Sequence, residues 1–335
     1  MTKISKNIEL SIIIVNYKTS EFVVKCINSI YKYTKNILFE ILVIDNNSND
    51  YSKKPICAIK KPVIWIELEQ NFGFGKANNI GIMHAKGKYI LLLNSDTQVV
   101  DNAIEDCLRR FINYEKNNIK GIYSCQLINT DKNPQNQAFN SIPTFKKLWH
   151  ENPFYLFFNK KQFEKNKETE IKNELSNQLH FNHPLWMSGA FLLFNKNLTN
   201  NIEYIFDEHF FMYFEDIELF LRLKKIGYIA IFDPKNTIIH VGGGSFIKNK
   251  KRFSQIMISK LLFVRKHYGF VFYIFYLSLM VINMALDEIL FIKKQTYEGK
   301  MAKEKRIWTL NILKSYWMKI LFYSKHNQAT FKYNA

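Results

Sequence analysis

The sequence predicts an α/β protein built on a mostly parallel central sheet with helices on both of its faces. Two observations predict this class. Short β-branched and apolar runs alternate with segments of helical spacing over the first hundred residues. Several runs, such as LSIIIVNY at 10–17, are apolar at consecutive positions, as expected of strands buried on both faces.

The elements of this half follow in order along the chain. Apolar spacing at Phe22, Val23, Cys26 and Ile30 indicates a helix, with Ser20 as its expected cap. The other runs are assigned in the same way, from periodicity and bounding turn residues. Strands are expected at 10–17, 39–48, 63–71, 88–96 and 121–129, and helices at 20–34, 75–87 and 101–118.

Beyond residue 129 the pattern weakens and then returns. Residues 130–182 carry prolines, an aromatic patch and a long polar run, which indicate a partly helical, variable excursion. Regular structure is expected again at 185–194 (a strand), 207–228 (a loop and a helix) and 229–245 (a strand). We therefore expect one domain over 1–245 and a basic, aromatic, helical tail over 246–335.

The charge of the chain indicates an anionic partner. Lys and Arg number 47 against 29 Asp and Glu, a net charge of +18. From Lys248 onward there are 17 basic and 4 acidic residues, which leaves +13 in the last quarter. Nucleic acid, a phosphorylated substrate and an acidic membrane would each fit this excess. The charge lies beside apolar aromatic helices rather than on a groove-reading motif, so we expect no nucleic-acid binding.

Two segments of the tail resemble membrane-surface helices. Residues 270–286 are almost wholly apolar, and 306–323 place Ile307, Leu310, Leu313, Trp317 and Leu321 on one side. Such helices, flanked by Lys and Arg, are typical of interfacial attachment. Packing on the domain, a homodimer contact and a true membrane span are the alternatives. A span is disfavoured because 17 helical residues cover roughly 25 Å, short of a hydrocarbon core of about 30 Å.

The four cysteines are scattered and form no C-x-x-C pair. A disulfide framework or a zinc site is therefore not expected, and a reducing compartment fits. The N-terminus holds no long apolar stretch of the signal-peptide type. We expect a cytoplasmic protein at the inner face of the cytoplasmic membrane.

Polar residues follow three of the expected strands. Asn16, Asp45 and Asp96 all fall at carboxyl ends, the edge where ligands of parallel sheets bind. Asn and Asp are also ordinary turn formers, so each residue alone has a structural explanation. Together, one carboxylate could bind a base or ribose, and the other could hold a divalent ion against a diphosphate.

The loop NFGFGKANNIG at 71–81 joins a strand to a helix. Gly73 and Gly75 would allow close backbone approach to a ligand, and the helix N-terminus favours anions. A dinucleotide fingerprint fails here. Its third glycine would stand at Asn78, and the loop follows the third strand instead of the first.

Further candidates lie in the second half. Glu215 and Asp216 open an amphipathic helix, where they could complement the helix dipole or include a general base. Arg222 could pair with an acidic neighbour or contact a phosphate. His240 ends a strand before three glycines, so it is a candidate metal ligand or a structural residue, and we take His209 as structural.

Trp186 and Gly189 in WMSGAF could shape a donor pocket, because Trp offers a flat face to a sugar ring. Core packing is equally consistent with their spacing.

Seven stretches, taken in order over residues 10–245, resemble a family 2 glycosyltransferase of the GT-A fold, closest to rhamnosyltransferase-like bacterial members. They are SIIIVNYKTSEFVVKCINSI, ILVIDNNSND, NFGFGKANNIGI, YILLLNSDT, WMSGAFLLF, FFMYFEDIELFLRLKKIGY and IIHVGGGS. The ordered set is specific although each stretch is modest alone.

The resemblance implies a role for most of these residues. Asp45 would hydrogen-bond the nucleotide base, with Asn16 nearby. Asp96 would bind Mg²⁺ or Mn²⁺ through the diphosphate, and His240 could complete the metal shell. Asn94 replaces the first acid of the family's D-x-D motif, a departure that bears on metal dependence. The loop expected along the nucleotide-sugar contributes Gly73, Phe74, Gly75 and Asn79.

The implied reaction is an inverting displacement in which Asp216, or Glu215 beside it, deprotonates an acceptor hydroxyl. The implied donor is dTDP-rhamnose, and a UDP-hexose is the alternative because thymine and uracil present the same imide edge. The acceptor would be a glycan or a lipid-linked oligosaccharide of cell-surface polysaccharide synthesis. A non-catalytic scaffold of the same fold is the rival, and the joint presence of Asp45, Asp96, Asp216 and His240 disfavours it.

Overall fold

The structure is a computed structural model that describes residues 7–135, 139–141, 143, 185–242, 249–291, 316–317 and 320–321. The chain forms two compact units. The first comprises the described residues of 1–142, 181–211 and 215–246, and the second those of 143–180, 212–214 and 247–335. Most of the expected excursion at 130–182 and of the expected helix at 306–323 lies outside the described residues.

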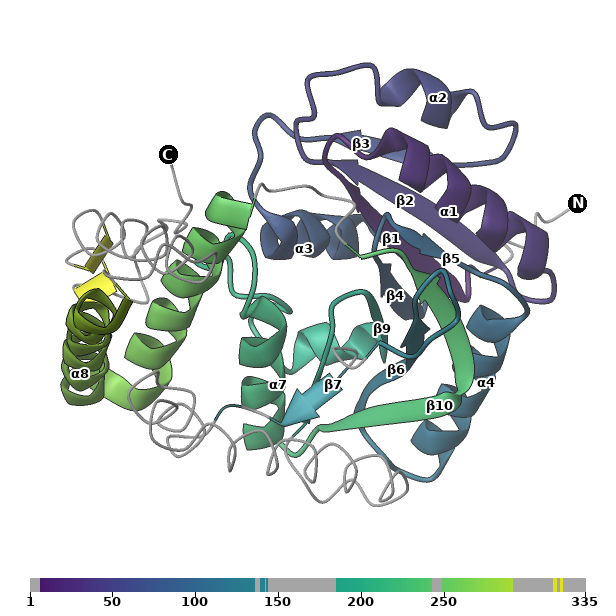
Figure 1. Ribbon diagram of the computed structural model, residues 1–335. Helices are drawn as coiled ribbons and strands as arrows, with labels where there is room; N and C mark the ends of the chain where they lie inside the picture. Colours follow the sequence, from purple (N-terminus) through teal and green to yellow (C-terminus); the bar gives the residue numbers. More distant parts are fainter. Residues whose placement is uncertain are drawn as a thin grey trace, which may run out of the picture. The chain divides into compact units, whose positions relative to one another are not determined.

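The first unit is built on an eight-stranded sheet of order β3-β2-β1-β4-β9-β6-β10-β5 (Figure 1). A two-stranded sheet pairs β7 with β8. The strands of the large sheet are β1 (Leu10–Asn16), β2 (Phe39–Asp45), β3 (Ile64–Glu67), β4 (Tyr89–Leu93), β5 (Thr97–Gln98), β6 (Gly121–Ile128), β9 (Phe191–Asn195) and β10 (Ile229–His240). Those of the small sheet are β7 (Phe139–Ser141) and β8 (Leu185–Met187).

The helices of this unit alternate with the strands, as the sequence predicts. They are α1 (Ser20–Tyr33), α2 (Lys53–Cys57), α3 (Phe74–His84), α4 (Ala103–Lys116), the 3₁₀ helix η1 (Lys196–Asn200) and α7 (Glu215–Lys225). Helix α3 packs on β1 and β2, and α4 packs on β6, β9 and β10 (Figure 1).

The sheet is mostly parallel, which confirms the predicted fold class. β1 runs parallel to β2 and β4, β2 to β3, and β6 to β10. β9 is antiparallel to both β4 and β6, so one reversed strand stands between two parallel groups. β5 is also antiparallel, to β10.

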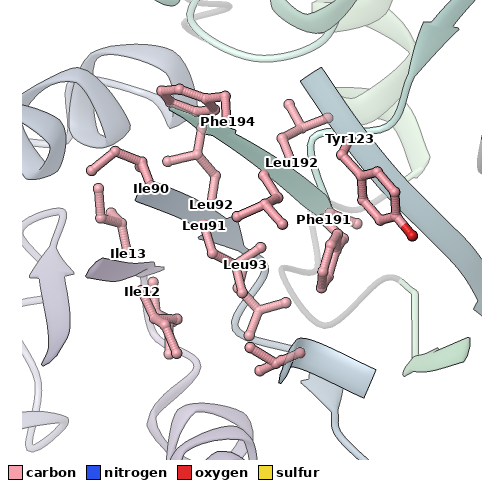
Figure 2. Packing of buried hydrophobic residues seen from close by; sticks show 14 of the residues in the cluster. Ile12, Ile13, Ile90, Leu91, Leu92, Leu93, Tyr123, Phe191, Leu192 and Phe194 are labelled. Carbon is pink, nitrogen blue, oxygen red and sulfur yellow. The ribbon is translucent and has the colours of Figure 1, made fainter. Parts of the chain in front are cut away.

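The core lies where the central strands are apolar at every position. Figure 2 shows Ile90 to Leu93 of β4 beside Phe191, Leu192 and Phe194 of β9, with Ile12 and Ile13 of β1 next to them. All of these side chains are buried. At about 25 cal/mol per Å² of apolar surface, each such side chain contributes roughly 1.5 to 3 kcal/mol. The consecutive apolar runs are therefore explained by burial on both faces.

Several expected boundaries were wrong. The N-cap of α1 is Thr19, not Ser20, and the Thr19 hydroxyl donates to Asn16 Oδ1 at 3.1 Å instead of capping the helix. Helix α3 ends at His84, three residues before the expected 87. α2 and β5 were not predicted, because elements of five and two residues are too short to show periodicity.

The second unit contains the long helix α8 (Asn249–Phe291). Gly269, with φ 83° and ψ −179°, interrupts it, so two helical segments meet at this glycine. Residues 270–286 are helical, as expected. Within the described residues no helix has the length and apolarity needed to cross a membrane.

Candidate active site

A polar cluster lies where β1 and β2 end. The two strands are paired in register, so their last residues, Asn16 and Asp45, are direct neighbours. Asn16 Nδ2 donates to Asp45 Oδ1 at 2.7 Å, and Ser48 Oγ donates to the same oxygen at 2.5 Å. Ser48 N donates to Asp45 Oδ2 at 3.1 Å. The structure thus brings together two residues predicted for base binding, and it fixes the orientation of the carboxylate.

Two members of this cluster were not predicted. Ser48 lies in the NNSND turn and also accepts from Lys18 N at 3.0 Å. Thr19 N and Oγ1 both donate to Asn16 Oδ1, at 3.2 and 3.1 Å. Ser and Thr after a strand are usual turn formers, so their types alone gave no signal of a site.

A second cluster follows β4 at Asn94, Ser95 and Asp96. Asp96 is buried, and its Oδ1 lies 3.3 Å from His240 Nε2. Asn94 Nδ2 is 3.4 Å from the same ring nitrogen. Backbone contacts bring these residues together. His240 of β10 pairs with Thr97 of β5, and Val241 N donates to Asp96 O at 2.9 Å. Thr19 Oγ1 lies 3.2 Å from Ser95 Oγ, and this contact joins the cluster to the first.

The Asp96–His240 pair fits a divalent cation that also binds a phosphate. In the described part of the chain, no group of three or more His, Cys, Asp and Glu side chains gathers in a metal-binding arrangement. Mg²⁺ in phosphate-handling sites usually takes one or two carboxylates and completes its shell with phosphate oxygens and water. One carboxylate and one imidazole are therefore sufficient if a diphosphate supplies further ligands.

The loop before α3 is shaped by Asn46. Its Nδ2 donates to Asn71 Oδ1 and to Gly73 O, both at 3.0 Å, and its Oδ1 accepts from Phe72 N at 2.9 Å. Gly73 has φ 88°, and a Cβ there would lie 2.1 Å from Phe211 O. At Gly75 a Cβ would lie 2.9 Å from Phe206 Cβ. Packing within the protein therefore requires both glycines, and their approach to a ligand stays a prediction.

Two further residues of this loop are engaged within the protein. Asn79 Nδ2 donates to Phe206 O at 2.7 Å, and Asn79 Oδ1 accepts from Phe206 N at 3.0 Å. Phe74 N donates to Phe211 O at 2.9 Å, and its ring lies 5.7 Å from that of Phe206. These contacts fasten segment 206–211 to α3. Donor contacts of Phe74 and Asn79 stay predictions.

Asp216 is placed as a general base would be. It is partly buried in the first turn of α7, where Ile217 N donates to its Oδ1 at 2.8 Å and Gly189 N to its Oδ2 at 3.4 Å. Burial raises the pKa of Asp216 to about 6, against the lowering effect of these backbone donors. A carboxylate with this pKa is ionised at neutral pH yet basic enough to accept a proton.

Glu215 differs from its neighbour. It is 6% exposed, and its Oε2 has no hydrogen-bond partner among the described residues. Burial, and then the charge of Asp216, raise the pKa of Glu215 well above its usual range. Glu215 therefore keeps its proton near neutral pH, which favours Asp216 of the two as the base. Directly before them, Tyr213 and Phe214 both have positive φ, 67° and 68°, a conformation uncommon for such side chains.

The turn between β8 and β9 connects Asp216 to the end of β4. Ala190 O accepts from Asn94 N at 3.0 Å, one residue after the Gly189 N–H that faces Asp216. A Cβ on Gly189 would lie 3.0 Å from the ring of Phe74, so this glycine also leaves room for a neighbour. Trp186 is partly buried and packs against the core, consistent with the packing alternative.

Arg222 does not join the other candidates. Its guanidinium donates to Glu218 Oε2 at 2.8 Å, to Tyr204 O at 3.0 Å and to Ile205 O at 2.5 Å. These contacts favour a structural role over donor binding. His209 Nδ1 contacts Asp207 Oδ1 at 2.6 Å, in keeping with the structural role expected for it.

Comparison with known proteins gives three findings. The model of the family described as "Glycosyl transferase family 2" matches residues 11–217. "Glycosyltransferase GlyG" of Streptococcus pneumoniae is 27% identical over 201 residues, which cover 58% of this chain and 59% of that protein. A teichoic acid poly(glycerol phosphate) polymerase of Staphylococcus epidermidis is 23% identical over 237 residues, 69% of this chain and 30% of the polymerase.

One solved structure shares the fold over nearly the whole chain. It is a mannosyltransferase from Pyrobaculum calidifontis, solved in complex with GDP-Man and Mn²⁺. The TM-score is 0.51 at 12% identity, and the match covers 95% of this chain and 84% of the other. This likeness confirms the GT-A fold and nothing finer. The chain spans less than two thirds of each of the two relatives.

Proposed function

The chain belongs to glycosyl transferase family 2, and on that premise we propose that it is an inverting glycosyltransferase of cell-surface polysaccharide synthesis. It moves L-rhamnose from dTDP-rhamnose to a hydroxyl of a glycan or lipid-linked acceptor. A UDP-hexose is the alternative donor, because both nucleotide bases present one imide edge to Asp45.

The observation that carries this proposal is the state of Asp216. Its carboxylate is held by two backbone N–H groups and has a pKa raised to about 6. It is joined through Gly189 and Ala190 to Asn94, and so to the strand end that carries Asp96. A base and a candidate diphosphate site on one sheet edge are what a sugar transfer between two bound substrates requires.

The proposed step is a single displacement. Asp216 accepts the proton of the acceptor hydroxyl as its oxygen bonds to the anomeric carbon. The bond from that carbon to the diphosphate oxygen breaks on the opposite face, and its electron pair leaves with the nucleoside diphosphate. Glu215 stays protonated, so it adds no second negative charge beside the base. General base assistance of this kind contributes about 10²- to 10⁴-fold.

Asp96 and His240 would hold a Mg²⁺ or Mn²⁺ ion. When bound, such an ion neutralises charge that develops on the departing diphosphate. Asn94 replaces the first acid of the family's D-x-D motif, so Asp96 supplies the one negative charge of this motif.

A thermal-shift panel tests the donor. The wild type and Asp96→Ala are heated with dTDP-rhamnose, UDP-glucose, UDP-galactose, UDP-N-acetylglucosamine or GDP-mannose, each with and without Mn²⁺. We expect Mn²⁺-dependent stabilisation by dTDP-rhamnose that Asp96→Ala loses. The control is Asp106→Ala, which removes a carboxylate from α4 and should retain the shift. Stabilisation by a UDP-sugar would identify that sugar nucleotide as the donor. If the protein is folded and no nucleotide-sugar stabilises it, the result would favour a non-catalytic scaffold.

We also propose that α8 attaches the protein to an anionic membrane surface. Phe270, Val271, Phe275, Val281 and Ile282 are 53%, 81%, 40%, 51% and 47% exposed and share one face of the helix. Tyr273, Tyr276 and Met280 on its other side are buried. Apolar side chains exposed on one helical face, in a tail (residues 248–335) with a net charge of +13, support interfacial binding.

Vesicle sedimentation tests the attachment. We expect the protein to sediment with phosphatidylglycerol–phosphatidylcholine vesicles and less with phosphatidylcholine alone. The double variant Val271→Ser/Phe275→Ser should lose most of this binding. The control Met83→Ser, on an exposed position of α3 in the other unit, should keep it. A protein that ignores vesicles and dimerises through the same residues would make a second copy the partner instead.

A further inference from the structure

We propose that Gln135 is a positioning residue that fixes the tautomer of His240 and so leaves its Nε2 lone pair for a cation. The role of the cation rests on the proposed function. The tautomer follows from hydrogen bonds within the protein. Gln135 lies between β6 and β7, 105 residues before His240 in the sequence.

The orientation of the Gln135 amide is decided by a backbone carbonyl. Gln135 Nε2 lies 2.6 Å from His240 O, and a carbonyl oxygen can only accept. The same nitrogen donates to Asn129 Oδ1 at 2.8 Å. If the amide were flipped, its oxygen would face the carbonyl of His240, and both would be acceptors. The NH₂ group therefore faces His240 O, and Oε1 takes the remaining position.

That remaining position faces the imidazole ring. Gln135 Oε1 lies 2.9 Å from His240 Nδ1. Because an amide oxygen only accepts, Nδ1 must carry the proton. In the neutral ring the lone pair is then on Nε2, which lies 3.3 Å from Asp96 Oδ1. This lone pair lies 3.4 Å from the donor Asn94 Nδ2 and beside the Asp96 carboxylate oxygen, so Nε2 and Oδ1 can bind one cation together.

The position of Gln135 is itself fixed by the fold. Gln135 N donates to Leu127 O at 2.8 Å, and Pro134 forms a bridge with Ile128. The turn before it is closed by Asn129 N, which donates to Asn133 O at 2.8 Å. β6 runs parallel to β10, the strand that ends at His240. Both the main chain and the amide of Gln135 are therefore held where they meet the ring.

The tautomer is measured first, without any metal or nucleotide. Two-bond ¹H–¹⁵N correlation spectra of ¹⁵N-histidine-labelled protein distinguish Nδ1–H from Nε2–H rings, and His240→Gln assigns the signal. At a pH where the ring is neutral, we expect the Nδ1–H tautomer in the wild type, a partial or full change to Nε2–H in Gln135→Leu, and retention of Nδ1–H in Gln135→Glu. An Nε2–H ring in the wild type overturns the proposal whatever the protein binds.

Mn²⁺ binding is measured next, by electron paramagnetic resonance in the presence of UDP and of dTDP. Residues behind a metal ligand typically change affinity by 10- to 100-fold. We expect the Mn²⁺ dissociation constant to rise by about that factor in Gln135→Leu and less in Gln135→Glu. The control is Asn201→Leu, which removes a side-chain amide that donates to a backbone oxygen away from His240, Asn197 O at 3.0 Å. Thermal melting verifies that each variant is folded.

The two measurements separate the possible failures. In the first case the ring is Nδ1–H but the protein binds no Mn²⁺ with either nucleotide. The tautomer is then confirmed, whereas its role in cation binding is refuted, and the result counts against the cation of the proposed function. In the second case the protein binds Mn²⁺ through Asp96, but Gln135→Leu leaves the dissociation constant unchanged. This result overturns the positioning role of Gln135 and leaves the proposed function intact.

Discussion

Replacing Asp216 by Asn should remove activity and yet make the protein more stable at neutral pH. The pKa of Asp216 is raised from 3.8 to about 6 because burial penalises the charged form. A carboxyl whose pKa is raised on folding contributes stability at low pH, and that contribution is lost as pH rises through the folded pKa. A difference of about two pH units corresponds to about 3 kcal/mol at neutral pH.

The expected gain is smaller than this figure. Asn can still accept from Ile217 N, but its NH₂ group cannot accept from Gly189 N, and a lost hydrogen bond costs about 1 kcal/mol. We therefore expect Asp216→Asn to raise the free energy of unfolding by about 2 kcal/mol at about pH 7.5. At about pH 4.5 the wild type has lost only about 1 kcal/mol, so the gain should vanish there.

Urea unfolding followed by far-UV circular dichroism at both pH values measures these differences. The control is Asp106→Asn on α4, which should change stability by less than about 0.5 kcal/mol at either pH. A destabilised Asp216→Asn protein at pH 7.5 would refute the reasoning. So would a gain of equal size at the two pH values, because the carboxylate would then not be the desolvated group that we infer.

Three other predictions concern neighbouring residues. The kcat/KM for slow transfer of the sugar to water should fall about tenfold per pH unit below about 6, as Asp216 is protonated. Glu215→Gln should show the same fall at acidic pH, because the Glu215 carboxyl of the wild type is already protonated. In chemical denaturation, Gly73→Ala should lower the free energy of unfolding by about 2 to 3 kcal/mol more than the control Gly227→Ala. Both glycines have positive φ, but only Gly73 faces a carbonyl oxygen, Phe211 O. Arg222→Met should cost about 3 kcal/mol of stability by separating the guanidinium from buried Glu218, and a changed donor affinity at unchanged stability would contradict its structural role.

The alternation of strands and helices could be predicted from the sequence because consecutive apolar runs and helical spacing are local signals. The polar residues at the strand ends could be predicted for the same reason, since Asn16 and Asp45 close such runs and Asp96 follows one. The strands themselves end earlier than expected, at Asp45 instead of 48 and at Leu93 instead of 96. Gly73 and Gly75 were recognised as special positions, but their neighbours, Phe211 and Phe206, are over 130 residues away and invisible to periodicity.

Residues whose role depends on distant contacts could not be found. Gln135 lies in a stretch of turn residues, and its partner His240 is 105 residues further along the chain. Thr19 and Ser95 meet across 76 residues in the same way. Arg222 was read as a candidate for phosphate binding because its charge is evident in the sequence. The carbonyl groups of Tyr204 and Ile205, which accept hydrogen bonds from its guanidinium, cannot be recognised in the sequence.

The reversed strand β9 brings a backbone hydrogen-bond donor to the sheet edge at which the candidate site lies. The parallel strands β1, β2 and β4 end at that edge. β9 runs the other way, so its beginning arrives at that edge and brings an amide N–H, that of Gly189, within 3.4 Å of Asp216. Such donors lower the pKa of Asp216, whereas Glu215 lacks an equivalent side-chain partner among the described residues. One inverted strand thus supplies, beside the N–H of Ile217, a backbone donor that keeps the pKa of Asp216 low enough for its carboxylate to be ionised at neutral pH.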